Sequence, residues 1–136
     1  MPEHYQLLYL SRLAADTTPL CVAEIVRAAR QRNQAEEINS LLVFDGVRFC
    51  QYLAGEAATV RALAERIRAD PRHIDFRVLY EGVLSGPSPL ARRRLAYALC
   101  YDDSLDRIEQ AGGAQAIALL TSLLPSFDRE PEPPRP

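Results

Sequence analysis

A hairpin signal near the middle of the chain constrains its fold more than any other feature. The dipeptide Asp45-Gly46 separates two short apolar runs, Leu41–Phe44 and Arg48–Ala54. Asp-Gly between strand-like segments favours a two-residue turn, because glycine readily adopts the positive φ that such turns need. The two runs are therefore predicted to be neighbouring antiparallel strands.

Helical and strand-like segments alternate on both sides of this hairpin. Apolar residues spaced by three or four predict helices over 21–34 and 56–69, the second ended by Pro71. We expect Gly55 to end the strand before the second helix. Further apolar runs predict three more strands, over 6–11, 76–84 and 95–101. The predicted order is βαββαββ, with a loop over 85–89 where glycine and prolines gather.

Two short amphipathic helices are predicted after the last strand, over 102–111 and 115–124. The order of elements indicates an α/β (α+β) fold, a ferredoxin-like sandwich with the first two helices on one face of the sheet. The first strand is apolar on both faces, so we expect the two C-terminal helices to cover the opposite face. The predicted organisation is a domain over 1–101, a helical cap over 102–124 and a proline-rich disordered tail over 125–136.

Composition excludes several classes of function. The 136 residues suit one domain, and a net charge of -2 gives no basic field for binding nucleic acid. The sequence has no apolar run long enough for a membrane span and no secretory signal at Met1, so a cytoplasmic protein is expected. Three widely spaced cysteines and two histidines make a metal site improbable, so none is predicted. Known phosphate-binding and hydrolase motifs are also absent from the sequence.

Strand and helix periodicity brings polar side chains into one predicted cleft. Alternation places Phe49, Gln51 and Leu53 on one face of the third strand, and Leu7, Tyr9 and Ser11 on one face of the first. On the first helix, a stripe spaced by four is formed by Ile25, Ala29 and Asn33. The cleft would hold a phenol, two amides and several apolar side chains, which suits a flat, mostly apolar ring with polar edges.

Four segments of the chain share their order and spacing with those of a known family. They are Leu7-Leu8-Tyr9-Leu10-Ser11-Arg12, Ala29-Arg30-Gln31-Arg32-Asn33, Phe49-Cys50-Gln51-Tyr52-Leu53-Ala54-Gly55 and Arg66-Ile67-Arg68-Ala69-Asp70-Pro71-Arg72-His73. Together they resemble BLUF domains, the sensors of blue light that use FAD. The resemblance covers residues 5–83.

The resemblance implies a role for each candidate site residue. Tyr9 would be the photo-oxidised electron donor, and Gln51 would bridge Tyr9 and the N5–O4 edge of a non-covalently bound flavin. Asn33 would hydrogen-bond the pyrimidine part of the flavin ring. Ile25 and Phe49 would pack on or beside the ring. The flavin-anchoring positions at the second helix would be Arg66, Asp70, Arg72 and His73, with Arg72 the strongest candidate.

The same resemblance implies a photoreceptor and not an enzyme. FAD is the expected cofactor, with FMN as the alternative. A red-shifted signalling state would pass to a separate effector protein or through a homo-oligomer, since the chain carries no attached effector domain. Neither nucleic acid nor membrane is expected as a partner.

The chain also departs from the family pattern. Ala29 stands where the family has a serine, and Glu37-Ile38-Asn39-Ser40 replaces its GITG. The chain has no tryptophan, and its only methionine is Met1, so Tyr97 and Leu99 align with the usual tryptophan and methionine of the fifth strand. These departures leave a second interpretation open, a flavin-free interaction module on a degenerate BLUF scaffold. A third, an acylphosphatase-like enzyme, lacks a glycine-rich anion loop before the first helix.

Overall fold

One mixed sheet lies at the centre of the computed structural model, which describes residues 4–84 and 96–129. Its strands follow the order β4-β1-β3-β2-β5-β6, antiparallel except for the parallel pair β2 and β5. In chain order the elements are β1 (His4–Leu13), α1 (Pro19–Glu36), β2 (Asn39–Phe44), β3 (Arg48–Glu56), α2 (Ala57–Ala69), β4 (His73–Val83), β5 (Ala96–Leu99), α3 (Ser104–Ala111), α4 (Gly113–Leu123), the 3₁₀ turn η2 (Leu124–Ser126) and β6 (Asp128–Arg129).

The first six elements form the predicted ferredoxin-like unit. The order β4-β1-β3-β2, with β1 and β3 in the centre, arises when two βαβ crossovers interlock on one antiparallel sheet. The hairpin that joins β2 and β3 turns at Gly46, whose φ is +95°. The predicted fold class is confirmed.

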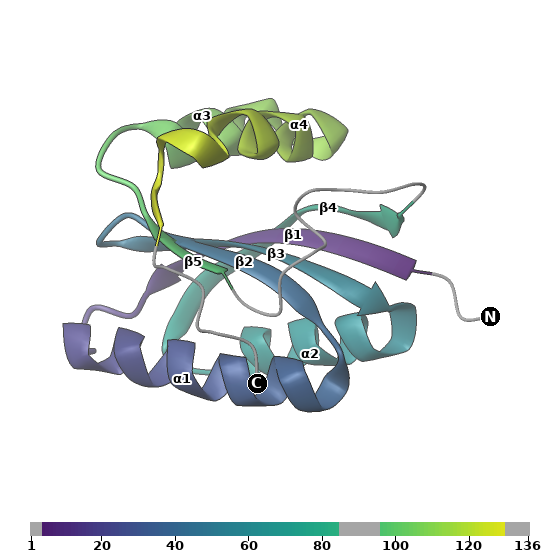
Figure 1. Ribbon diagram of the computed structural model, residues 1–136. Coiled ribbons are helices and arrows are strands. Elements are labelled where there is room, and N and C mark those ends of the chain that lie inside the picture. Colours follow the sequence, from purple (N-terminus) through teal and green to yellow (C-terminus); the bar gives the residue numbers. More distant parts are fainter. Residues whose placement is uncertain (1–3, 85–95, 130–136) are drawn as a thin grey trace.

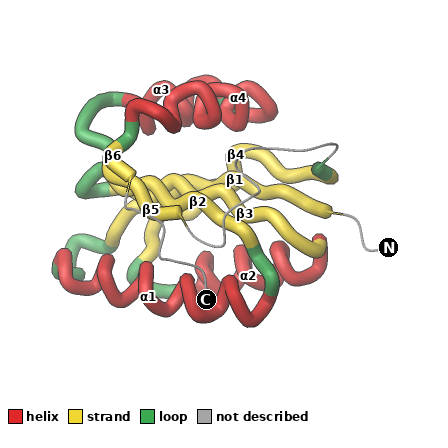
Figure 2. Tube along the Cα trace, viewed as in Figure 1, coloured by secondary structure: helices red, strands yellow, loops and turns green. Residues whose placement is uncertain are grey.

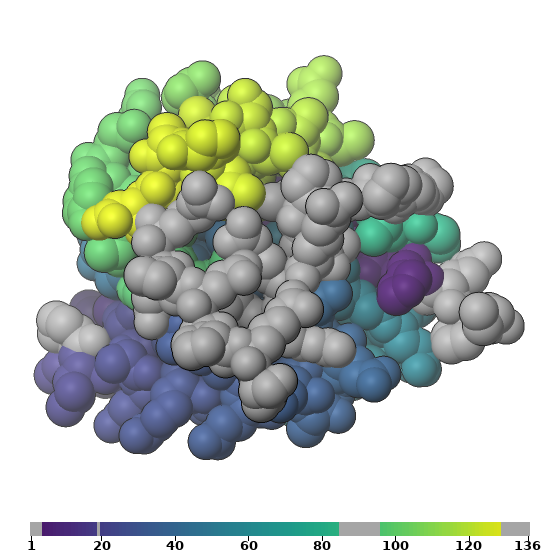
Figure 3. Space-filling view, viewed as in Figure 1, coloured from purple at the N-terminus to yellow at the C-terminus, as the bar shows by residue number. Residues whose placement is uncertain are grey.

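Helices cover both faces of the sheet (Figure 1). Helices α1 and α2 lie along one face, and α3 and α4 lie across the other, so the sheet is the middle layer of three (Figure 2). In the space-filling view the C-terminal helices and α1 lie at opposite sides of the molecule (Figure 3). The C-terminal helices therefore supply the second cover that the sequence predicted.

Alternation along the central strands divides the core between these two faces. On β3, Cys50 and Tyr52 pack with the residues of α3 and α4, whereas Phe49 and Leu53 pack with those of α1 and α2. This is the period of two expected of a strand that is buried on both sides. Within the described residues, no helix combines the length and the apolar character needed to cross a membrane.

Several predicted boundaries differ from those of the structure by a few residues, and three of them have an identifiable structural reason. Gly55 does not end β3, which continues to Glu56; its φ is not positive, so its backbone fits an ordinary strand. Strand β4 begins at His73 and not at Phe76, because a bulge near Asp75, whose φ is +53°, lets the chain pair with β1 three residues earlier.

The third correction concerns the predicted tail over 125–136. Residues up to 129 are ordered, since Phe127 packs into the core under α4 and β6 pairs with β5. Residues 130–136, the predicted loop over 85–89 and the first residue of the predicted fifth strand lie outside the described residues.

Candidate functional site

A pocket lies between α1 and α2, above the central strands of the sheet. Its empty space is about 390 Å³, counting the part open to solvent. The lining residues come from six elements and from the turn between α2 and β4: Tyr9, Ile25, Ala28, Ala29, Arg32, Leu42, Gln51, Ile67, Asp70, Arg72 and His73.

Tyr9 and Gln51 meet at the floor of this pocket. They are partners in the β1–β3 register, so their side chains leave the sheet side by side on the same face. The Tyr9 hydroxyl donates a hydrogen bond to Gln51 Oε1 at 2.5 Å, and the two residues are 1% and 3% exposed. With Oε1 accepting from Tyr9, the amide nitrogen of Gln51 keeps its two donors for other groups in the pocket.

The surroundings of Tyr9 keep its phenol neutral. Burial raises the pKa of Tyr9 well above its ordinary value, Cys50 and Asp70 raise it further, and only Arg32 lowers it. One ring face stacks on Phe76, with centroids 4.7 Å apart. The hydroxyl proton therefore stays on Tyr9 in the resting protein.

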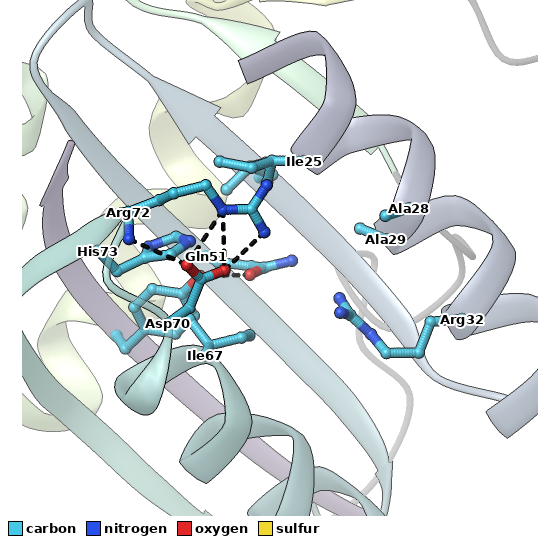
Figure 4. A pocket seen from close by; sticks show the side chains of 11 residues that line it. Ile25, Ala28, Ala29, Arg32, Gln51, Ile67, Asp70, Arg72 and His73 are labelled. Carbon is cyan, nitrogen blue, oxygen red and sulfur yellow. Dashed lines mark hydrogen bonds and ion pairs between the residues drawn. The ribbon is translucent and has the colours of Figure 1, made fainter. Parts of the chain in front are cut away.

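Apolar side chains form the wall of the pocket on the α1 side. Ile25, Ala28 and Ala29 face the pocket from α1, and Leu42 lies on the adjacent strand β2. The two alanines leave room where larger side chains would fill the space between helix and sheet. Ile67 closes the opposite side from the end of α2 (Figure 4).

An ion pair marks the end of α2 beside the pocket. The guanidinium of Arg72 contacts both carboxylate oxygens of Asp70, with Nη2 2.6 Å from Oδ2 and Nε 3.0 Å from Oδ1 (Figure 4). The side-chain hydrogen bonds from Arg72 hold the pKa of Asp70 below its ordinary value, and the same pair raises the pKa of Arg72. Asp70 also accepts from the backbone N–H of Arg72, so the turn after α2 fixes both side chains.

His73 is buried behind this pair as a neutral imidazole. Its Nδ1 lies 2.9 Å from Ser11 Oγ, and its ring lies 4.9 Å from that of Phe49. Burial lowers the pKa of His73, and the nearby charges of Arg72 and Arg32 lower it further, against the opposing effect of Asp70.

Arg32 is a site residue that the sequence analysis did not identify. It lies on α1 and points toward the space between the two helices (Figure 4). Its Nε is buried and has no hydrogen-bond partner within the described residues. The spacing of Ile25, Ala28, Ala29 and Arg32 at three or four residues is the signal that could have revealed it.

Three predicted cofactor residues lie outside the pocket lining. Asn33 is fully buried, and its Nδ2 donates to Ser40 Oγ at 2.8 Å. Phe49 is buried under α1 and stacks on Phe44. Arg66 is exposed on α2 and pairs with Glu36 of α1. The other six predicted residues line one pocket: Tyr9, Ile25, Gln51, Asp70, Arg72 and His73.

The lining residues fit a flat aromatic cofactor. Small and apolar side chains on α1 and α2 leave a gap for a ring, and the amide of Gln51 is buried where the ring's polar edge would lie. The chemistry of this donor set thus agrees with a flavin, whose ring carries carbonyl and nitrogen acceptors along one edge.

Comparison with known proteins gives a family match over most of the described chain. The family model described as sensors of blue light using FAD matches residues 4–87. A curated relative, the blue light- and temperature-regulated antirepressor BluF of Escherichia coli (strain K12), is 33% identical over 70 residues, which are 52% of this chain. The match covers 17% of the length of that relative.

Solved structures show the same fold. The dark-state structure of BlrB, a BLUF protein, matches with a TM-score of 0.76 and 23% identity, covering 93% of this chain and 98% of that chain. The photo-activated state of BlsA matches with a TM-score of 0.78 and 21% identity, covering 95% and 99% of the two chains. A bacterial light-regulated adenylyl cyclase matches with a TM-score of 0.66 and 19% identity over 90% of this chain and 36% of that chain.

Proposed function

This chain belongs to the BLUF family, the sensors of blue light that use FAD, and we propose that its pocket binds one FAD and that Tyr9 and Gln51 form its light-operated switch. The family is described as sensors of blue light, so the proposed role of this chain is that of a sensor. The observation that carries the proposal is the buried hydrogen bond from the Tyr9 hydroxyl to Gln51 Oε1 on the floor of the pocket.

The pocket residues divide into those that hold the ring and those that respond to light. Ile25, Ala29 and Ile67 would pack against the ring faces, and Arg72, fixed by Asp70, would contact the polar part of the cofactor outside the helices. Asn33, on α1, and Phe49, on β3, lie behind this lining; small movements of α1 would bring Asn33 to the ring and uncover Phe49.

A bound flavin supplies absorption of blue light and a strongly oxidising excited state. Tyr9 is the oxidisable side chain at the floor of the pocket, and its neutral phenol can lose an electron and then its proton. That proton has a direct acceptor in Gln51 Oε1 at 2.5 Å. Because burial raises the pKa of Tyr9, its hydroxyl proton leaves only after the Tyr9 phenol has lost an electron.

Gln51 would convert this proton movement into a signal. Its amide has both donors and an acceptor, so rotation or tautomerisation of the side chain changes which groups donate and which accept. The new pattern would strengthen a hydrogen bond to a flavin carbonyl and shift the absorption to the red. Gln51 lies on β3 between Cys50 and Tyr52, which face α3 and α4, so a shift of this strand would reach the C-terminal helices. From there the signal would pass to a separate effector protein or to a second copy of the chain.

Flavin content tests the proposal directly. Protein expressed in a flavin-replete host should be yellow and should release one FAD per chain on denaturation, identified by chromatography against FMN and riboflavin. A colourless protein that also fails to take up FAD on refolding would instead support a flavin-free interaction module.

A further inference from the structure

Two arginines, Arg32 on α1 and Arg66 on α2, are possible ion-pair partners for the carboxylate of Glu36. Glu36 lies one turn after Arg32 on α1, the spacing at which side chains of opposite charge pair along a helix. Glu36 nevertheless pairs with Arg66 of α2, whose Nη2 lies 2.9 Å from both carboxylate oxygens. The ion pair therefore joins α1 to α2.

Arg32 is left facing the pocket. Its guanidinium lines the same cavity as Gln51, and its Nε is buried without a hydrogen-bond partner within the described residues. A buried donor without a partner is costly, and the cost falls when a ligand supplies an acceptor. The charge of Arg32 also reaches the floor of the pocket, because it lowers the pKa of Tyr9.

We propose that Arg66 is a positioning residue: by binding Glu36 it prevents a pair between Glu36 and Arg32 and leaves Arg32 aimed into the pocket, where it donates to the carbonyl edge of the flavin ring. This inference rests on the proposed function. It also gives Arg66 a role different from the direct flavin contact implied by the sequence, because Arg66 lies outside the pocket lining.

The charges around Arg32 support this arrangement. Burial lowers the pKa of Arg32 first, and Arg66 and Arg72 lower it further, whereas Tyr9 and Glu36 raise it. Two other guanidinium groups thus act on Arg32, and both have carboxylate partners, Arg66 in Glu36 and Arg72 in Asp70. Arg32 is the remaining cation, and an electron-rich ring edge is the partner that its position favours.

A set of variants of the full-length chain tests the proposal. Riboflavin is titrated into flavin-free protein, and the dissociation constant is measured by quenching of its fluorescence. Arg32→Met should weaken binding by about tenfold or more, since it removes a charge-assisted hydrogen bond. Arg66→Met should weaken binding by about threefold, because Glu36 then draws Arg32 away from the ring for part of the time.

The decisive variant is the double substitution Glu36→Gln with Arg66→Met. It removes both members of the ion pair, so Arg32 is free again and riboflavin affinity should return to that of the wild type. Glu36→Gln alone should leave the affinity unchanged, and Arg66→Met should add nothing in the Arg32→Met background. Arg68→Met is the matched control, since Arg68 is exposed on the same helix and, among the described residues, its ion pair is with Glu65, at 3.8 Å.

Other outcomes would overturn the inference. If affinity stays low in the double variant, or if Glu36→Gln weakens binding as much as Arg66→Met, Arg66 does not act by keeping Glu36 from Arg32. If Arg66→Met affects FAD but leaves riboflavin unchanged, Arg66 acts on the phosphates. Failure of the wild-type chain to bind either flavin would instead contradict the proposed function itself.

Discussion

The two faces of the sheet are both covered by helices, but they bury different chemistry. The face under α3 and α4 packs a continuous apolar cluster that includes Leu8, Leu41 and Leu120. The face under α1 and α2 has two smaller apolar clusters with the pocket between them. Among the described residues, buried polar side chains gather on this second face, at Ser11, Asn33, Ser40, Gln51 and His73; Ser104, at the start of α3, is the exception.

Neighbouring residues on β3 show the contrast most directly. Cys50 faces the C-terminal helices, where burial raises its pKa to about 12, so its thiol acts as a small apolar side chain. Gln51 faces the pocket, and its amide accepts from Tyr9. A buried amide lowers stability unless its groups are satisfied, so the second face holds the function while the first supplies stability.

Removal of the C-terminal helices should have the largest effect. Deletion of residues 102–136 would uncover the apolar cluster around Leu8 and Leu41, a patch large enough to drive association. We expect the truncated chain to aggregate or to unfold, as measured by light scattering and circular dichroism. Deletion of 130–136 alone serves as the control. A truncated chain that stays monomeric and equally stable would show that α3 and α4 are not a required cover.

Leu120→Ala should separate stability from light sensing. Leu120 is fully buried in the cluster under α4, so its truncation should lower the free energy of unfolding by about 2–5 kcal/mol. Flavin content and the light-induced spectral shift should not change in the folded fraction. Leu119→Ala, at a half-buried position one residue earlier, should cost less. A loss of the spectral shift in folded Leu120→Ala would mean that the two faces are not independent in this way.

His73 should make the pocket face sensitive to pH, with a smaller effect. Burial lowers the pKa of His73 in the folded chain, so the unfolded chain binds the proton more tightly. The stability of the flavin-free chain should be full above the unfolded pKa of about 6.5 and should fall as the pH drops below it. Denaturant unfolding of wild type and His73→Asn at about pH 7.5 and about pH 5.5 measures the difference. An equal fall in both proteins would assign the pH dependence to other groups.

The sequence was sufficient for the fold because local signals agreed with one another. The Asp45-Gly46 turn set the hairpin, and period-two alternation placed Tyr9 and Gln51 on one face of the sheet. What it did not predict depends on contacts between distant elements. Strand β6 is only two residues long and exists through its pairing with β5, which proline-rich composition could not indicate.

The candidate site was predicted in part, because local sequence patterns locate some of its residues and not others. Tyr9 and Gln51 follow from strand alternation, whereas Arg32 has the appearance of an ordinary charged residue on a solvated helix. Arg66 pairs with Glu36, and Arg32 faces the pocket, because α2 packs beside α1 in the folded chain. Tertiary packing decides which charged side chains of different helices form ion pairs, and the spacing of residues in the sequence does not predict this.

The light-minus-dark difference spectrum of Gln51→Leu tests the central claim most directly. The substitution keeps nearly the same volume and removes the amide, and Tyr9→Phe removes the hydroxyl that donates to it at 2.5 Å. Both variants should bind flavin and lose the red shift that blue light produces in the wild type. Tyr97→Phe, which alters a half-buried residue on β5, should keep the shift and serves as the control. A normal red shift in flavin-loaded Gln51→Leu would contradict the assignment of the switch to Tyr9 and Gln51.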